Sequence, residues 1–332
     1  MKPFQLVWTF AVLSLMGPAS LAQEGRLLVA EKGDQKLAVF NGSTGELIGA
    51  VSVGGNTGHE VVASPDGRMA FVPIYGDSGV GKAGSDGSNM VAIDLASLKV
   101  TGNLDFGHGV RPHLPVFGPK DGLLYVTTEL DQSVTIVDPK TLKIVGSIPT
   151  GQTESHMLAI SHDGRRGYTA NVGPGTVSVL DMEARKTLKM IPISGKTQRI
   201  SISMDDHWVF TADQTKPELV VIDTTTGQVK RSIHLKGLGY GSTPTPDGHW
   251  LLVAIPDKDS VAVIDLRTMK VTQTIEVASA PQEVVVQPDG ATAWVSCLTA
   301  GQVIAIDLNS WRLSNSIQAG AQPDGMAWAP AQ

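Results

Sequence analysis

Three histidines recur in one register of an internally repetitive sequence. His59 and His156 each stand seven residues before an aspartate of a turn motif, and His113 stands eight residues before one. Imidazole is the commonest protein ligand of transition metals, and three imidazoles leave coordination positions open for water or a substrate. The register indicates a site for one divalent transition metal ion, with a polar lining of a wet channel mouth as the alternative.

Other polar residues occupy the same register in the remaining repeats, namely Gln198, Tyr240, Gln282 and, near the C-terminus, Asp324. In a cyclic array of repeats, equivalent positions on neighbouring units converge on the central axis. These side chains are therefore expected to surround the same mouth as the histidines. We predict Gln198, Tyr240 and Gln282 as ligand-binding residues.

Charged residues lie close to this register. Glu129 begins a loop on the same face and Glu154 precedes an inner strand, where either carboxylate can orient a metal-bound imidazole or act as a general base. Arg111 and Lys196 also precede inner strands and can bind an anionic substrate. Glu129, Glu154 and Arg111 are the predicted catalytic residues, and the alternative for each is a solvated residue at the rim.

The repeat that positions these residues has a period of about 42 residues. Turn aspartates stand at Asp66, Asp121, Asp163, Asp205, Asp247 and Asp289, with successive gaps of 55, 42, 42, 42 and 42. A second series ends an alternating apolar run at Asp94, Asp138, Asp181, Asp223, Asp265 and Asp307, with gaps of 44, 43, 42, 42 and 42. Two independent markers with one period indicate a tandem repeat, and this period is typical of β-propeller blades.

One unit shows how the sequence forms a blade. Apolar or alternating runs at 156–160, 167–170 and 176–180 predict three strands, and the more polar run 188–193 predicts a fourth. The turn at 161–164 contains a glycine, which accepts a positive φ without steric cost. Four such antiparallel strands make one propeller blade.

The units add up to an all-β, seven-bladed β-propeller of four-stranded antiparallel blades. Residues 27–51 supply only three strands, and the segment 322–328 aligns with 280–286. The C-terminal strand is therefore expected to complete the first blade and close the ring, which removes exposed strand edges. We predict a single propeller domain over residues 23–332.

One repeat carries an insertion, residues 75–88, with five glycines and two aspartates. In a propeller, the loop between the second and third strands opens on the face where the first strand starts, so the insertion is expected above the histidines. Tyr75 and Asp77 are therefore added to the predicted ligand-binding residues. The alternative is a surface insertion that the fold tolerates.

Several segments resemble the YVTN-type propeller repeat. They are Tyr125-Val126-Thr127-Thr128, the run from Asp131 to Asp138, and Tyr168-Thr169-Ala170-Asn171. The resemblance covers the whole mature chain and implies a seven-bladed propeller, often exported from bacteria or archaea. Such propellers occur as binding proteins, cell-surface proteins and parts of redox enzymes, and their relatives include lactonase-like enzymes. The resemblance therefore implies a fold and leaves the activity open.

The N-terminal segment has the features of a secretory signal peptide. Lys2 precedes an apolar run at 6–16 that is too short to span a bilayer, and residues 20–22 match a small-x-small cleavage site. We expect residues 1–22 to be cleaved, which predicts a periplasmic or secreted protein without a membrane span. Because the chain has a single cysteine, Cys297, no intrachain disulfide forms, and a buried, inert thiol is expected.

Composition and motifs exclude several classes of function. The net charge is −6 and the sequence has no basic stripe, so nucleic-acid binding is not expected. The sequence has no phosphate-binding loop, and no nucleotide cofactor is expected. It also lacks a Cys-x-x-Cys-His haem attachment site, zinc-type Cys/His spacing and a serine nucleophile elbow.

Three functional hypotheses remain. The first is a propeller that binds a small ligand or metal ion at the channel mouth formed by His59, His113 and His156 under the 75–88 loop. The second is a metal-dependent enzyme, a lyase, lactone hydrolase or oxidase, that uses the same site. The third is an extracellular scaffold that binds a protein partner on a propeller face and has no small-molecule site.

Overall fold

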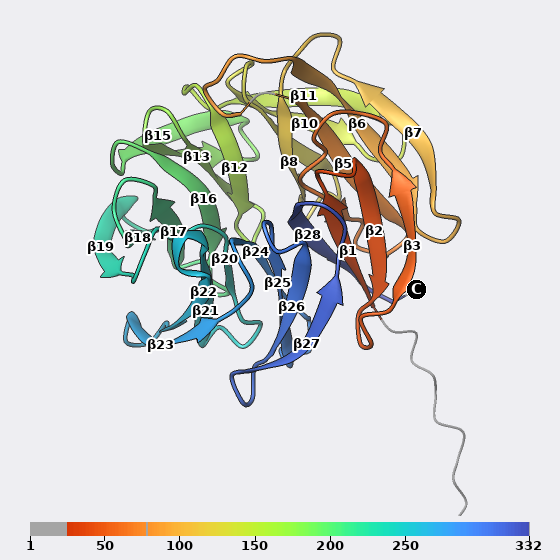
Figure 1. Ribbon diagram of the computed structural model, residues 1–332. Helices are drawn as coiled ribbons and strands as arrows, with labels where there is room; N and C mark the ends of the chain where they lie inside the picture. The colour runs from red at the N-terminus through yellow and green to blue at the C-terminus, as the bar shows by residue number, and fades with distance from the viewer. Residues whose placement is uncertain (1–24, 78, 332) are drawn as a thin grey trace, which may run out of the picture.

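The computed structural model describes residues 25–77 and 79–331. Seven four-stranded antiparallel sheets stand in a ring (Figure 1), so the predicted seven-bladed propeller is confirmed. The segment 1–22, predicted as a signal peptide, lies outside the described residues. No helix within the described part of the chain is long and apolar enough to cross a membrane.

Each blade runs from an inner strand near the ring axis to an outer fourth strand. The first blade is β28 (Pro323–Ala329), β1 (Arg26–Glu31), β2 (Lys36–Asn41) and β3 (Leu47–Ser52); the second is β4 (Val62–Ala63), β5 (Met69–Gly76), β6 (Asp86–Asp94) and β7 (Lys99–Asp105). The third is β8 (Pro112–Phe117), β9 (Leu124–Thr128), β10 (Ser133–Asp138) and β11 (Lys143–Pro149); the fourth is β12 (Ser155–Ile160), β13 (Arg166–Asn171), β14 (Thr176–Asp181) and β15 (Lys186–Pro192).

The other three blades repeat this order. The fifth is β16 (Thr197–Ile202), β17 (Trp208–Asp213), β18 (Glu218–Asp223) and β19 (Gln228–His234). The sixth is β20 (Ser242–Pro244), β21 (Trp250–Ile255), β22 (Ser260–Asp265) and β23 (Lys270–Glu276), with the short 3₁₀ helix η1 (Pro256–Lys258) between β21 and β22. The seventh is β24 (Pro281–Val286), β25 (Thr292–Cys297), β26 (Gln302–Asp307) and β27 (Arg312–Gln318).

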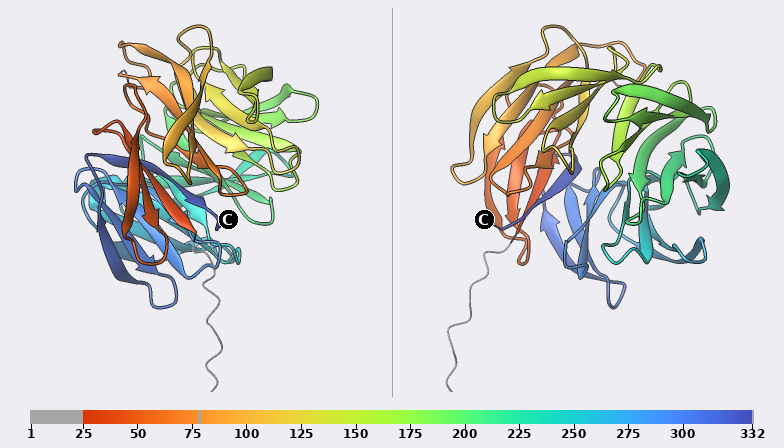
Figure 2. Two further views of the ribbon diagram at one scale, coloured as in Figure 1. Left: turned by 90° about the vertical axis from the view of Figure 1, so that its right-hand side faces the viewer. Right: turned by 180° about the vertical axis from the view of Figure 1, so that it is seen from behind.

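The ring is closed by the C-terminal strand. β28 pairs antiparallel with β1, with Leu27 opposite Trp328 and Val29 opposite Met326. Figure 2 shows this strand beside the N-terminal blade from two further directions. β1 thereby has a partner on both sides, which removes a free edge from the first blade. The predicted closure is confirmed.

The core lies between neighbouring blades. The second and third strands of each blade are almost wholly buried, whereas the fourth strands are exposed at most positions. The apolar clusters combine residues of adjacent blades, as where Leu252 and Val263 of the sixth blade pack with Val295 and Ile304 of the seventh. Burial of each such side chain contributes about 1.5–3 kcal/mol. Cys297 is fully buried in the same cluster, and burial raises the pKa of its thiol to about 12.

The inner strands are irregular where they begin, at the mouth of the channel. In β8, β12, β16, β24 and β28 the pairing register shifts within the first few residues. The residues inside these shifts are His113, Leu114, His156, Gln198, Arg199, Gln282, Glu283, Asp324 and Gly325. A bulge re-aims side chains that regular pairing would direct elsewhere. In these five blades the histidine register is thus a bulge position, whereas His59 and Tyr240 stand just before the short inner strands β4 and β20, which pair without a shift.

A left-handed residue precedes most of these bulges. Thr57, Arg111, Glu154, Ala280 and Gln322 all have φ between 50° and 59°, and each stands two residues before the register position of its blade. Non-glycine residues adopt this conformation at a cost of about 1–2 kcal/mol. The fold accepts this strain in five blades to turn the chain from the outer strand of one blade into the inner strand of the next.

Candidate functional site

The three histidines meet at the mouth of the channel. The Nε2 atoms of His59 and His113 are 2.7 Å apart and share a hydrogen bond. The rings of His113 and His156 lie 3.5 Å apart between centroids with 34° between their planes. Both His113 and His156 are buried. Three imidazoles from three consecutive blades therefore form one contiguous cluster.

Glu129 fixes the orientation of one imidazole. Its Oε1 accepts a short hydrogen bond from Nδ1 of His156, and its Oε2 accepts one of 2.7 Å from the Tyr75 hydroxyl. A carboxylate against Nδ1 holds the proton on that nitrogen and leaves the lone pair on Nε2. The amide nitrogen of Gln198 lies 3.3 Å from this Nε2 and is placed to donate to it. The lone pair of His156 is thus directed toward Gln198, on the wall of the mouth.

Gln198 and Tyr240 continue the wall of the mouth. The amide of Gln198 donates to the Tyr240 hydroxyl at 3.0 Å. The guanidinium carbon of Arg199 lies 4.6 Å from the centroid of the Tyr240 ring, within the range of a cation–π contact. These contacts fix the Tyr240 ring on the side of the mouth away from His59.

The cluster borders a small cavity of about 140 Å³. Its lining consists of Lys32, Thr57, His59, Tyr75, Gly79, Val80, His113, His156, Gln198, Arg199, Tyr240 and Asp324. At about 30 Å³ per water molecule, the cavity has room for roughly four or five waters or a ligand of a few heavy atoms. Gly79 and Val80 belong to the 75–88 insertion, so this loop forms part of the wall of the cavity beside the histidines.

Arg111 holds the insertion in place. Its Nε donates to Asp86 at 2.6 Å, and its NH2 donates to the carbonyl of Lys82 at 2.9 Å. Arg111 is buried, and its side chain faces the loop. The hydrogen bond from Arg111 to Asp86 raises the pKa of the guanidinium, although burial acts in the opposite direction. In this geometry Arg111 is a loop anchor, and its charge is matched by Asp86.

Three other predicted residues stay outside the cavity. Glu154 is half-buried and lies against Gly81 and Gly173. Asp77 is exposed, and it accepts a hydrogen bond from the backbone of Ser85 inside the insertion. Gln282 donates to its own neighbouring carbonyls and borders a second cavity of about 220 Å³ on the far side of Tyr240. Of the predicted residues, the structure brings together Tyr75, Glu129, Gln198, Tyr240 and the three histidines.

An ion network that the sequence interpretation missed forms the floor of the cavity. Arg199 is buried, and its NH1 lies 2.9 Å from Glu60 and 2.7 Å from Glu283. Asp324 is 3.5 Å from the NH2 of Arg199 and 3.6 Å from the amine of Lys32. Glu60 also lies 4.0 Å from Nε2 of His113. Two cations and three carboxylates are therefore packed directly beneath the imidazoles.

A sequence signal for this network exists. Glu60, Arg199 and Glu283 each stand one residue after the histidine register of their blades. Alternation along a regular strand would direct these positions away from the register residues, toward the neighbouring blades. The bulges of β16 and β24 change that direction for Arg199 and Glu283 and bring them to the channel, whereas Glu60 precedes the short strand β4. A search for charges one position after the register would have found the network.

Burial sets the protonation of the cluster. It holds the pKa of His59 well below its usual range, and the nearby positive charge of Lys32 acts in the same direction. Burial likewise lowers the pKa of His113. Burial raises the pKa of Glu60 to about 8, against the attraction of Arg199. At neutral pH, His59 and His113 are therefore neutral and have lone pairs available.

Buried polar atoms without a hydrogen-bond partner are concentrated here. Eight such side-chain atoms occur among the described residues. Six belong to the cavity and its floor. Of these, Glu60 Oε1 and Asp324 Oδ1 face Arg199 in ion pairs, which leaves Thr57 Oγ1, His59 Nδ1, His113 Nδ1 and Arg199 Nε without any partner among the described residues. Buried polar groups in folded proteins are almost always paired with protein, water or a ligand. This concentration marks the cavity as a place where another molecule supplies hydrogen-bonding partners.

The predicted metal centre is not preformed. Among residues 25–77 and 79–331, no group of three or more His, Cys, Asp or Glu side chains is spaced to hold a metal ion. Two nitrogens bound to one tetrahedral ion at about 2.0–2.1 Å stand roughly 3.3 Å apart, farther than the 2.7 Å between His59 and His113. A shared ion would replace their hydrogen bond and require a small separation of the rings.

Comparison with known proteins places the fold among characterised propellers. Residues 118–247 match the family model of the cytochrome D1 heme domain. The structure is similar to the Pseudomonas aeruginosa periplasmic gluconolactonase PpgL, with a TM-score of 0.73 and 16% identity over 93% of this chain and 99% of that one. No curated protein sequence matches the chain significantly.

Two further solved structures are similar to this chain. Hydrazine synthase of Kuenenia stuttgartiensis matches with a TM-score of 0.68 and 20% identity, over 82% of this chain and 90% of that one. The dihydro-heme d1 dehydrogenase NirN, in complex with DHE, matches with a TM-score of 0.66 and 16% identity, over 91% of this chain and 74% of that one. At these identities the likeness shows the fold alone. The expected kinship with lactonase-like propellers is confirmed at that level, and the YVTN repeat itself stays a prediction.

Proposed function

We propose that this chain is an exported β-propeller that binds a small ligand or a divalent transition metal ion in the cavity bounded by His59, His113 and His156 beneath the 75–88 loop. The leader of residues 1–22 directs export and is removed, which leaves a propeller domain of residues 23–332 in the periplasm or outside the cell. Similarity to a periplasmic gluconolactonase supports this location.

One observation carries the proposal: most of the buried polar atoms that lack a partner belong to this cavity. A buried donor or acceptor left unsatisfied costs about 1–3 kcal/mol, so the four atoms here that have neither a hydrogen bond nor an ion pair represent a large penalty without an occupant. The cavity is small, which favours an ion with its waters or a molecule of a few heavy atoms.

The donor set favours a transition metal over an alkaline-earth ion. His59 and His113 are held neutral by burial, and Nε2 of His156 carries a lone pair beside Gln198, with Glu129 behind its Nδ1. A carboxylate behind a ligating imidazole is the usual arrangement at zinc sites, and imidazole suits zinc, copper, iron and nickel. Glu129 would orient the ligand, and Tyr75 would fix Glu129.

A tetrapyrrole does not fit this cavity. The match to the heme-domain family covers residues 118–247, which include His156 but neither His59 nor His113. The cavity of about 140 Å³ is well below the 300–1,000 Å³ typical of pockets for larger ligands, and the insertion occupies one side of it. We therefore assign no role to heme at this site.

The metal proposal is tested on the purified mature protein. Metal content is measured by mass spectrometry, and the metal-free protein is titrated with Zn²⁺ by calorimetry and with Co²⁺ by absorption. We expect one site per chain, with affinity reduced at least tenfold in His113→Ala and about 10–100-fold in Glu129→Gln. His234→Ala, which changes an exposed histidine of β19, is the matched control. Equal affinity in His113→Ala and the unmodified protein would refute the site.

A second candidate function is lactone hydrolysis, favoured by the Tyr75–Glu129–His156 chain. Nε2 of His156 can accept a proton from a water that attacks the lactone carbonyl, and can return it to the ring oxygen as the C–O bond breaks. Turnover of a lactone panel that disappears in His156→Gln supports this candidate. If the protein binds metal but hydrolyses none of the lactones, the binding function alone is supported.

A further inference from the structure

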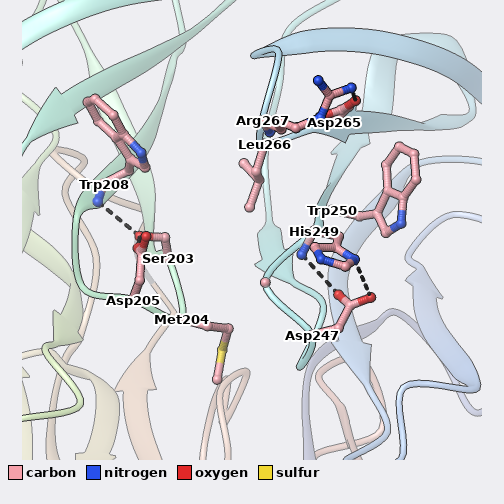
Figure 3. A pocket seen from close by; sticks show the side chains of 11 residues that line it. Ser203, Met204, Asp205, Trp208, Asp247, His249, Trp250, Asp265, Leu266 and Arg267 are labelled. Carbon is pink, nitrogen blue, oxygen red and sulfur yellow. Dashed lines mark hydrogen bonds and ion pairs between the residues drawn. The ribbon is translucent and has the colours of Figure 1, made fainter.

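A second, larger cleft opens on the opposite face of the propeller. It has a volume of about 770 Å³ and lies between the fifth and sixth blades, at the turns that join their strands. Figure 3 shows Trp208 on one side and Trp250 and His249 on the other, with Met204 at one end and Leu266 between the two walls. Its volume lies in the range of pockets that bind small molecules.

The two tryptophans distinguish this cleft from the other grooves of the ring. Trp208 and Trp250 each stand three residues after the turn aspartate of their blade, where the other complete blades have Met69, Leu124, Arg166 and Thr292. Trp208 and Trp250 are both only half-buried, in contrast to Trp294, which is fully packed between blades. The buried parts of Trp208 and Trp250 pack against the apolar clusters between neighbouring blades, and their exposed parts line the cleft.

Each indole of the cleft is supported from outside. Trp208 makes an edge contact with the His207 ring at 4.4 Å, and Trp250 makes one with Trp311 at 5.3 Å. Neither indole N–H donates a hydrogen bond to the described residues. Met204 remains 39% exposed beside them. The walls of the cleft thus include the exposed parts of the two indoles and the thioether of Met204.

Carboxylates give the cleft an excess of negative charge. Asp205, Asp247 and Asp265 each use Oδ1 to accept hydrogen bonds from the turn backbone. Oδ2 of Asp247 faces His249 at 3.2 Å, and Oδ2 of Asp265 faces Arg267 at 3.7 Å. Oδ2 of Asp205 forms no hydrogen bond or ion pair with the described residues. At neutral pH the lining therefore keeps more negative than positive charge.

The equivalent groove between the third and fourth blades is closed. Lys120 and Pro119 lie against Gly164 there, and only about 20 Å³ of space remains. That groove has no tryptophan in its lining. The open volume, the two indoles and the free carboxylate oxygen therefore coincide in one place, between the fifth and sixth blades.

We propose that this cleft binds the cationic group of a small organic molecule, a guanidinium or quaternary ammonium. Such a cation is attracted to the faces of indole rings, and the uncompensated carboxylate of Asp205 supplies the counter-charge. The alkyl part of the molecule packs on Met204 and Leu266. This site is separate from the histidine cavity and does not depend on the function proposed for it.

The test uses the full mature protein and two probes, tetramethylammonium and N-acetyl-L-arginine amide, titrated while tryptophan fluorescence is recorded. Sodium chloride at equal ionic strength and methyl β-glucoside serve as comparators. We expect saturable quenching by at least one cation and none by the comparators. Asp205→Asn retains an oxygen for the turn hydrogen bonds, and it should weaken binding at least about fivefold. Asp289→Asn, at the same turn position of the seventh blade, should leave binding unchanged.

Trp250→Leu provides a second variant and should abolish the response, with melting temperature recorded to show that the blade is intact. Three results overturn the proposal. They are the absence of saturable binding by either cation, equal binding of methyl β-glucoside, and an Asp205→Asn affinity equal to that of Asp289→Asn. Metal titrations probe the opposite face of the propeller. A negative result for cation binding in the cleft would therefore not affect the function proposed for the histidine cavity.

Discussion

The pH dependence of the free energy of unfolding should report the protonation state of Glu60 in the cavity floor. It is buried beside Arg199 and close to His113, and burial raises its pKa to about 8. In the unfolded chain the same carboxyl titrates near 4.5. Between these values the folded protein holds a proton that the unfolded chain has released. The stability supplied by the protonated carboxyl is complete below about pH 4.5 and is lost as the pH rises through 8.

The size of this effect follows from the pKa difference. Each unit corresponds to 1.36 kcal/mol, so a rise from 4.5 to about 8 corresponds to roughly 5 kcal/mol across the whole window. Substitution by glutamine removes the titrating group and retains an oxygen for Arg199. The free energy of unfolding of the unmodified protein, minus that of Glu60→Gln, should therefore fall by several kcal/mol between about pH 5 and pH 8.

Urea unfolding at several pH values measures this difference, since the free energy extrapolates linearly to water. Taking the difference cancels the titrating groups that are distant from Glu60 and common to both proteins. Glu276→Gln, at an exposed position at the end of β23, is the control and should show a constant difference. A Glu60→Gln difference that is also constant across this range would refute the assignment of a protonated, buried Glu60.

Three further predictions concern the same framework. Arg199→Met leaves Glu60, Glu283 and Asp324 without their shared buried cation and should lower the free energy of unfolding by about 3–5 kcal/mol, measured by urea denaturation. Deletion of residues 323–332 removes β28 and exposes the edge of β1, so size-exclusion chromatography should show aggregation, whereas deletion of 331–332 should leave a monodisperse protein. The Cys297 thiol should resist a disulfide reagent in the native protein and react fully in denaturant, because it is buried and its pKa is raised.

The fold could be predicted from the sequence because every blade repeats the same local signals. The turn aspartates and the strand-ending aspartates fix the period, and the alignment of 322–328 with 280–286 identifies the closing strand. Each signal is short-range, and ring closure follows once the units are counted. The structure adds the inner-strand bulges, which depend on how neighbouring blades pack.

The site could be predicted only in part, for a related reason. The period alone was enough to place His59, His113, His156, Gln198 and Tyr240 on one rim. It could not show that Arg111 turns toward the insertion or that Glu154 stays outside, because left-handed residues change the direction of the chain there. Arg199, Glu60 and Glu283 were not predicted, because a regular strand would direct them away from the register residues.

Glu60 lies between the histidine cluster and the ion network of the cavity floor. It lies 4.0 Å from Nε2 of His113 and 2.9 Å from Arg199, so it responds both to an occupant among the imidazoles and to the charge of the floor. A cation held by the histidines favours the ionised carboxylate, whereas an anion favours the protonated form. Below about pH 8, binding of a cation must therefore release protons from this carboxyl, and the affinity of the site must rise with pH. An exposed tri-histidine site would lose this dependence above the ordinary pKa of histidine, about 6.5. The buried carboxyl extends the dependence across neutral pH, which makes the floor part of the binding site.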